Sequence, residues 1–351
     1  MSHFEERMEA DLQIIRGRLW KLGEDVDAAL HNAKKVMILR DSELAYQTVL
    51  GDYPINRESR ECDRLCHTFI ARHLPGAGPL REMAATARVN VALERIGDYA
   101  VTISREALQL TSPISDQLTS DIAAMFDESI SILSDSRKSF LDGNADMAIA
   151  LMKVAKRVQN RMDGVYETLF AEDDRMDGAT MMAIFVVFNL LKRIVDQAKN
   201  ICDQTVYAVK GIAKIPKTYR VLFLDQPGSG MAHLATAIGR KNYPESGFFM
   251  PATHGVADPV STELQGFLVE RGLPDEDLVT EQLEVSEHDL DDFTVIVSLV
   301  GKYSDYISKV PFHTSALNWV LPEDHDLKQN YRVLREEIQQ LMVCMAGDDA
   351  G

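Results

Sequence analysis

The chain has 351 residues, of which 46% are apolar and 26% charged, a composition typical of soluble proteins with one or two packed domains. Its formal net charge of −17 disfavours direct binding to nucleic acid and to anionic membrane surfaces. We see no apolar run of the roughly 18 to 20 residues that a bilayer span requires, and no basic then apolar order at the start of the sequence. We therefore expect a cytoplasmic protein without membrane insertion.

Apolar residues recur at helical spacing from Phe4 to about Ile212, while glycine and proline are confined to a few clusters. This part of the chain is predicted to be entirely helical. The first helix is expected to end near Leu39, the second to run from about 42 to 73, and the third from 80 to 110. The fourth is expected to begin after 111–115, the fifth to begin within 141–146, and the sixth to follow 172–178 and end near Gly211.

Six helices suggest an internal repeat of three. The segment "LERIGD" at 93–98 resembles "LKRIVD" at 191–196, and the two are offset by 98 residues, about half of the helical region. We therefore predict two tandem three-helix domains, 1–112 and 113–213.

The pattern changes after residue 218. The run "RVLFLD" at 220–225 predicts a buried strand that enters the glycine-rich turn "QPGSG", and "FTVIVSLV" at 293–300 predicts a second strand. A third strand is expected within 314–323, and apolar residues spaced three and four apart predict an amphipathic helix over 327–345. The fold class is therefore multi-domain, an all-α half followed by an α/β domain with a small parallel sheet at 219–347.

The helix predicted over 80–110 carries two carboxylates on one face. Glu94 and Asp98 lie four residues apart and therefore point the same way. Two such like charges cost roughly 0.2 to 0.5 kcal/mol of helix stability, whereas a divalent cation would be held by their hard oxygen atoms. The alternative is an ordinary solvated face in which Arg95 relieves Asp98.

The second copy of this motif keeps the aspartate, Asp196, but has Lys192 in place of the glutamate. Lys192 is able to pair with Asp196 and would then weaken the need for a cation. Asn200 and Asp203 continue the same face at intervals of four and three, which leaves a partial oxygen-rich site. We predict that at most one of the two faces holds metal.

These motifs make residues 4–212 similar to the PhoU family, tandem three-helix regulators associated with bacterial phosphate uptake. The turn "LPGAGPLR" at 74–81 and the ending "KNICDQ" at 199–204 also resemble that family. The resemblance implies a negative regulator of phosphate uptake and phosphate-responsive signalling that acts by protein contact. It implies a phosphate ABC transporter subunit or a phosphate-sensing histidine kinase as partner, and allows for a homodimer. It implies iron, zinc or another divalent cation at Glu94, Asp98 and Asp196.

The C-terminal part, 219–345, resembles the low-molecular-weight phosphotyrosine phosphatases and arsenate reductases. The resemblance rests on "RVLFLD", on 245–273 and on "WVLPE" at 319–323, where Glu323 aligns with the general acid. These enzymes need C-x5-R, with a thiolate nucleophile and an arginine that binds the phosphoryl oxygens. Here Asp225 stands at the cysteine position, and the first arginine after it is Arg240.

We therefore expect no catalytic residues, no enzymatic activity and a pseudo-phosphatase domain. Asp225, Gly228, Ser229 and Gly230 would form a degenerate anion loop, or only a strand-to-helix turn. The alternative function is an enzyme of this class with altered phosphoryl chemistry, in which Asp225 would be the nucleophile. A di-metal oxidase of the helical-bundle type is disfavoured because neither repeat has histidine three residues after the glutamate.

Overall fold

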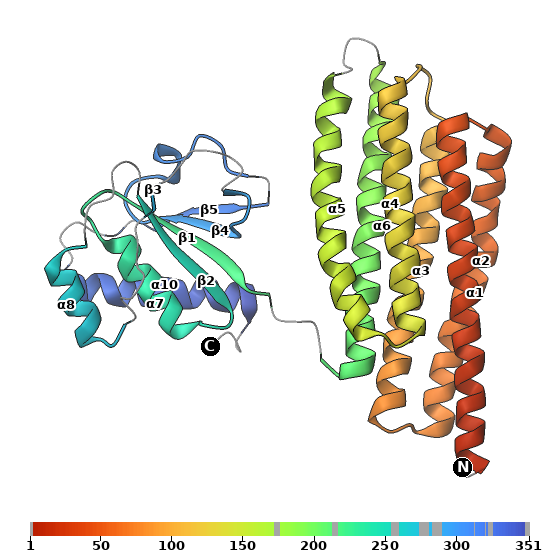
Figure 1. Ribbon diagram of the computed structural model, residues 1–351, viewed down its shortest axis with the longest axis horizontal. Helices are drawn as coiled ribbons and strands as arrows, with labels where there is room; N and C mark the ends of the chain where they lie inside the picture. Colours follow the sequence, from red (N-terminus) through yellow and green to blue (C-terminus); the bar gives the residue numbers. More distant parts are fainter. Residues whose placement is uncertain are drawn as a thin grey trace. The chain divides into compact units, whose positions relative to one another are not determined.

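The computed structural model of the protein describes residues 3–171, 176–212, 217–253, 260–273, 281–282, 290–311, 313–319, 321 and 326–347. The chain divides into two units, residues 1–214 and 215–351. The first is a bundle of long helices and the second a parallel sheet with helices (Figure 1).

The helical unit confirms the all-α prediction for the first part of the chain. Its helices are α1 (His3–Leu39), α2 (Ser42–His73), α3 (Ala77–Ala107), α4 (Asp116–Leu141), α5 (Ala145–Ala171) and α6 (Gly178–Lys210). Asp41, Ser115 and Asp177 each accept a hydrogen bond from a first-turn amide and so fix the starts of α2, α4 and α6. Helix α3 begins earlier than predicted because Pro79 lies in its first turn, where a missing N–H has no cost.

One continuous apolar core joins all six helices. Fully buried side chains include Leu22 of α1, Ile96 of α3, Phe126 of α4 and Phe188 of α6. Burying each such side chain contributes about 1.5 to 3 kcal/mol. Apolar stripes at helical spacing therefore provide the main driving force for the bundle.

Helix α6 corrects the expectation that no segment is apolar and long enough to cross a membrane. An 18-residue window in Gly178–Lys210 has a mean hydropathy of 1.6, and half of that window is buried within the protein. Ile184, Phe188, Leu191 and Ile194 pack into the core of the bundle. The apolar character of α6 is thus accounted for by its place among the other helices.

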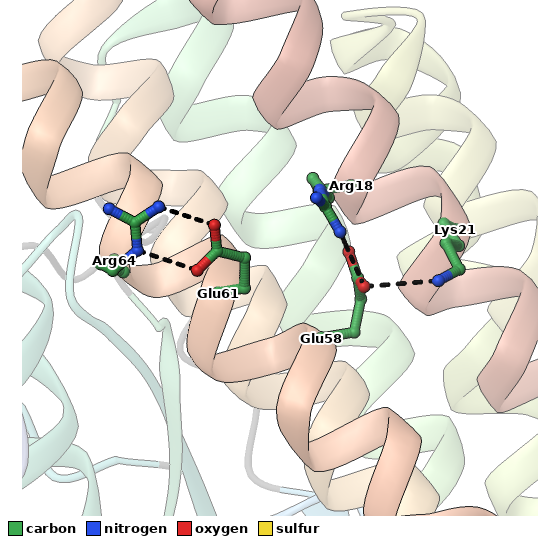
Figure 2. A network of polar contacts seen from close by, with 5 residues as sticks. All are labelled: Arg18, Lys21, Glu58, Glu61 and Arg64. Carbon is green, nitrogen blue, oxygen red and sulfur yellow. Dashed lines mark hydrogen bonds and ion pairs between the residues drawn. The ribbon is translucent and has the colours of Figure 1, made fainter.

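A buried glutamate links α1 to α2. Glu58 of α2 has an 8% exposed side chain and accepts hydrogen bonds from Arg18 Nη1 at 3.0 and 3.1 Å and from Lys21 Nζ at 3.4 Å. Figure 2 shows this carboxylate directed toward α1, whereas the neighbouring Glu61–Arg64 pair stays on α2. Because two cations surround Glu58, its burial is compensated.

The C-terminal unit is an α/β domain, as predicted. It contains the strands β1 (Tyr219–Asp225), β2 (Gly247–Thr253), β3 (Glu281–Gln282), β4 (Val295–Ser298) and β5 (Ser315–Asn318), the helices α7 (Met231–Asn242), α8 (Thr262–Glu270) and α10 (Leu327–Ala346), and the 3-10 turn η1 (Tyr303–Asp305). The sheet is parallel throughout, in the order β3-β2-β1-β4-β5.

Strand β1 lies in the middle of this sheet and contributes buried side chains to both faces. Val221 and Phe223 pack with α7 and α10, whereas Leu222 and Leu224 pack with Phe293 and its neighbours on the other face. This alternation follows from the two-residue period of a strand. The carboxyl end of β1, where Asp225 lies, is therefore at the centre of the sheet edge.

Candidate functional site

The face of α3 that carries Asn90, Glu94 and Asp98 lies beside α2. Buried Asn90 of α3 donates from Nδ2 to the backbone carbonyl of Ser59 at 3.0 Å. Two turns further along, a Cβ on Gly97 would come within 3.2 Å of the Ile55 side chain of α2, so the missing side chain permits a close approach of the two helices. Glu94 and Asp98, on the same face as Asn90, therefore lie beside α2 rather than on an isolated solvent face.

Two further oxygen donors come from α2. Asn56 Nδ2 donates to Asp52 Oδ2 at 2.6 Å. Asp52 Oδ1 and Asn56 Oδ1 are buried and have no hydrogen-bond partner among the residues that the structure describes. Buried oxygens without a donor are costly, so a cation or a further donor at this position would stabilise them.

The carboxylates of α2 and α3 lie close enough for their charges to change one another's pKa values. Partial burial raises the pKa of Glu94, and the charges of Asp98 and Asp52 raise this pKa further. Burial and the Asp52 charge likewise raise the pKa of Asp98. Each group is therefore easier to protonate than an isolated carboxyl, because burial and at least one neighbouring carboxylate disfavour its charged form.

The chemistry of this donor set suits a hard or borderline divalent cation. Three carboxylates and one amide oxygen from α2 and α3 are the ligand types that such ions bind at about 2 to 2.6 Å. Within the described part of the chain, no group of three His, Cys, Asp or Glu side chains lies close enough together to hold a metal ion in this conformation. The carboxylates would have to rotate toward each other for metal to bind. We call Asp52, Asn56, Glu94 and Asp98 the carboxylate face.

The second copy of the motif has a different environment. Asp196 Oδ1 accepts a hydrogen bond from Gln159 Nε2 of α5 at 2.6 Å and lies 3.7 Å from Lys199 Nζ. Lys199 in turn donates to Gln159 Oε1 at 3.2 Å. Asp196 thus has both a hydrogen-bond donor and a nearby cation.

Asn200 and Asp203 lie in a groove between α3 and α6 with a volume of about 580 Å³. Arg88 of α3 is fixed in this groove, because it donates to Gln204 Oε1 at 3.2 Å and lies over the ring of Tyr207. Exposed Arg95 lines the same groove. Two guanidinium groups against one carboxylate, that of Asp203, make its lining locally basic in an acidic protein.

The predicted anion loop of the C-terminal unit is occupied by its own aspartate. Asp225 is 1% exposed. Its Oδ1 accepts the amide of Gln226 at 2.8 Å, and its Oδ2 accepts those of Met231 and Ala232 at 2.7 and 3.1 Å. The two latter amides belong to the N-terminus of α7, where an external anion would otherwise bind.

The two glycines of this loop provide its shape. Gly228 and Gly230 have φ values of 83° and 72°, and a Cβ on Gly230 would lie 2.6 Å from the Leu264 side chain. Burial raises the pKa of Asp225, and hydrogen bonds from Ala232, Ser229, Gln226 and Met231 oppose this rise. A carboxylate held by three amides is not free to attack a phosphoryl group. Glu323, the aligned general acid, lies outside the described residues.

The helical unit is therefore a bundle of long helices with an oxygen-rich face between α2 and α3. Residues 19–107 match the PhoU domain family. The phosphate-specific transport system accessory protein PhoU of Escherichia coli K12 is 30% identical over 213 residues, which cover 60% of this chain and 88% of that protein. The PhoU homologue from Pseudomonas putida is 28% identical, and the match covers 60% of this chain and 83% of that protein.

Solved structures agree with this relation. PhoU from Pseudomonas aeruginosa has a TM-score of 0.55 at 28% identity, with 58% of this chain and 99% of that chain covered. The PhoU of Streptococcus pneumoniae has a TM-score of 0.54 at 22% identity, with 60% and 99% covered. The chain belongs to the PhoU family.

Proposed function

We propose that this protein is a negative regulator of phosphate uptake and phosphate-responsive signalling that acts by protein contact and not as an enzyme. The observation that carries the proposal is the match of the helical unit to nearly the whole length of proteins named as phosphate transport accessory proteins. Its partner would be a phosphate ABC transporter subunit or a phosphate-sensing histidine kinase in the cytoplasm. The groove between α3 and α6 offers such a partner a basic, hollowed surface.

This function is tested in cells that lack the gene. Phosphate uptake in phosphate-replete medium is expected to rise several-fold on deletion and to return to normal with the wild-type gene. An affinity pull-down from replete cells should then retain the transporter or the kinase. Unchanged uptake together with neither partner in the pull-down would overturn the proposal.

The groove is tested separately by reversing one exposed charge. Arg95→Glu should weaken partner capture, since a partner that fits this surface must carry negative charge. Arg193→Glu makes the same change at an exposed position of α6 that does not line the groove, and serves as the control. Equal loss or equal retention in both variants would argue against the groove as the contact surface.

We further propose that the carboxylate face binds iron, zinc or another divalent cation and that the metal tightens the contact between α2 and α3. The unpartnered oxygens of Asp52 and Asn56 support this assignment. Asp196 is a weaker candidate because Gln159 and Lys199 already satisfy it. The metal's contribution would be structural: it would neutralise charges that otherwise repel each other across the two helices.

Glu94→Gln is expected to stabilise the metal-free protein slightly at neutral pH. The pKa of Glu94 is raised by folding, so its contribution to stability is fully present below the unfolded pKa and is lost as pH rises through the folded pKa. The gain of the variant should therefore grow from about pH 4 to pH 7, to roughly 0.5 kcal/mol.

The same variant tests metal binding. Zinc or ferrous iron should raise the melting temperature of the wild type but not that of Glu94→Gln. Glu61→Gln, a change at a carboxylate of α2 that pairs with Arg64, should respond to metal like the wild type. An equal metal-induced shift in all three proteins would exclude the carboxylate face as the site.

The C-terminal unit would serve as a docking or ligand-sensing module, a pseudo-phosphatase in the sense of the resemblance above. Asp225 supports this by occupying the place where a nucleophile and an external anion would meet. Equal background turnover of a generic aryl phosphate by the wild type and Asp225→Asn is the expected result. Turnover that disappears in the variant would favour the enzyme alternative.

A further inference from the structure

The groove between α3 and α6 has the size of a small-molecule site. The two helices run side by side through the bundle (Figure 1). The groove's volume of about 580 Å³ lies within the roughly 300 to 1,000 Å³ that is usual for pockets of small ligands. Its lining includes the buried apolar side chains of Val89, Ala92 and Ile201, together with guanidinium and amide groups. This lining suits a molecule that has both apolar and charged parts.

The two cations of the groove are not paired with a carboxylate. Among the residues that the structure describes, neither Arg88 nor Arg95 forms an ion pair, whereas Arg137 of α4 forms two. Arg88 has neutral partners instead: it donates to Gln204 Oε1 at 3.2 Å and lies over the ring of Tyr207. These contacts hold the guanidinium in place and use few of its N–H groups, so the others are available to an anion.

The spacing of the two arginines indicates how large the ligand is. Arg88 and Arg95 are seven residues apart on one side of α3, which separates their backbones by about 10 Å along the helix. A single phosphate ion at Arg88 would leave Arg95 and most of the groove unused. A nucleotide would use both, with its phosphoryl groups at one guanidinium and its planar base stacked on the other. Gln197 and Asn200, which also line the groove, carry amide donors and acceptors for the edge of a base.

The charge balance of the groove predicts opposite effects for two of its residues. The formal net charge of −17 repels anions from the protein as a whole, so an anion must be held by cations gathered locally. Arg95 contributes to this local attraction. Asp203 is the carboxylate in the groove lining and opposes it. Removal of the positive charge should therefore weaken anion binding, and removal of the negative charge should strengthen it.

We propose that the groove between α3 and α6 binds a phosphorylated small molecule of nucleotide size. Arg88 would hold the phosphoryl groups and Arg95 the base, over the apolar part of the lining. The ligand would then compete with an acidic protein partner for the same guanidinium groups. That regulatory consequence rests on the proposed function, whereas the binding of the small molecule does not depend on it.

Isothermal titration calorimetry of the full chain with ATP tests the proposal, in EDTA so that metal at the carboxylate face makes no contribution. The wild type should bind ATP saturably, with a dissociation constant below about 1 mM. Arg95→Gln should weaken binding roughly tenfold through the loss of one charge-assisted contact. Arg193→Gln makes the same change at an exposed position of α6 outside the groove and should bind like the wild type. Far-UV circular dichroism verifies that both variants are folded.

Asp203→Asn should tighten ATP binding roughly threefold, a gain that a damaged fold would not produce. Asp127→Asn changes the net charge equally at an exposed position of α4 and should leave the affinity unchanged. Inorganic phosphate at the concentration of ATP should not displace it. No saturable binding up to about 1 mM, equal affinities of Arg95→Gln and Arg193→Gln, weaker binding by Asp203→Asn, or displacement by phosphate would each overturn the proposal. Because the titration contains no protein partner, its failure would leave the proposed regulatory function standing.

Discussion

Arg137→Ala is expected to lower the free energy of unfolding of the helical unit by about 3 kcal/mol, the low end of the cost of breaking a buried ion pair. Arg137 of α4 is 7% exposed and donates from Nη2 to Glu24 Oε1 at 2.8 Å and from Nη1 to Asp27 Oδ2. Its removal leaves the Asp27 carboxylate of α1 without its cation. Glu24 is half exposed, so water can solvate its carboxylate after Arg137 is removed, and the main cost arises at Asp27.

The guanidinium of Arg137 lies directly over Gly23. A Cβ on Gly23 would come within 2.2 Å of Arg137 Nε, so the glycine makes room for the side chain between α1 and α4. Gly23→Ala should therefore destabilise the wild type. In the Arg137→Ala background, where the space is empty, the same change should stabilise by about 0.5 to 1 kcal/mol through its helix propensity.

This sign reversal is measured by a double-mutant cycle, with chemical unfolding followed by circular dichroism at 222 nm. Lys34→Ala is the matched control, because Lys34 pairs at 2.5 Å with an exposed aspartate, Asp127, across the same two helices. It should cost less than about 1 kcal/mol. Additive effects of Gly23→Ala and Arg137→Ala would show that the guanidinium does not depend on the glycine.

None of these contacts across helices could be predicted from the sequence. The helical period placed Glu94 and Asp98 on one face, because that relation is local to one helix. Asp52 and Asn56 complete the carboxylate face from α2, and only the packing of α2 on α3 brings them there. Their own spacing of four residues in "DYPIN" was a signal for this second half of the face.

The C-terminal unit illustrates the same limit. The strands β1 and β4 were predicted from uninterrupted apolar runs, whereas β2 was not, since Pro251 interrupts "GFFMPAT" and prolines are rare within strands. The position of Asp225 after β1 was evident from the sequence. Its hydrogen bonds to the start of α7 depend on the path of the turn, which Gly228 and Gly230 determine through their positive φ angles.

Asp225→Ala should destabilise the C-terminal unit by about 3 kcal/mol, because three amides lose their acceptor in a buried place. Hydrogen exchange of the peptides that contain residues 219–232 is expected to accelerate more than a hundredfold, which corresponds to this loss. Asp326→Ala is the control, since Asp326 is an exposed N-cap of α10 and its loss should cost about 1 kcal/mol.

Asp225→Ala also tests whether the loop between β1 and α7 is able to bind an anion. With the carboxylate removed, the amides of Gln226, Met231 and Ala232 would surround an empty position at the N-terminus of α7. Sulfate or phosphate should then slow the exchange of Asp225→Ala and leave the wild type unchanged. An equal effect of phosphate on both proteins would mean that the anion binds elsewhere, whereas protection of the variant alone would show that Asp225 occupies the position of a bound anion.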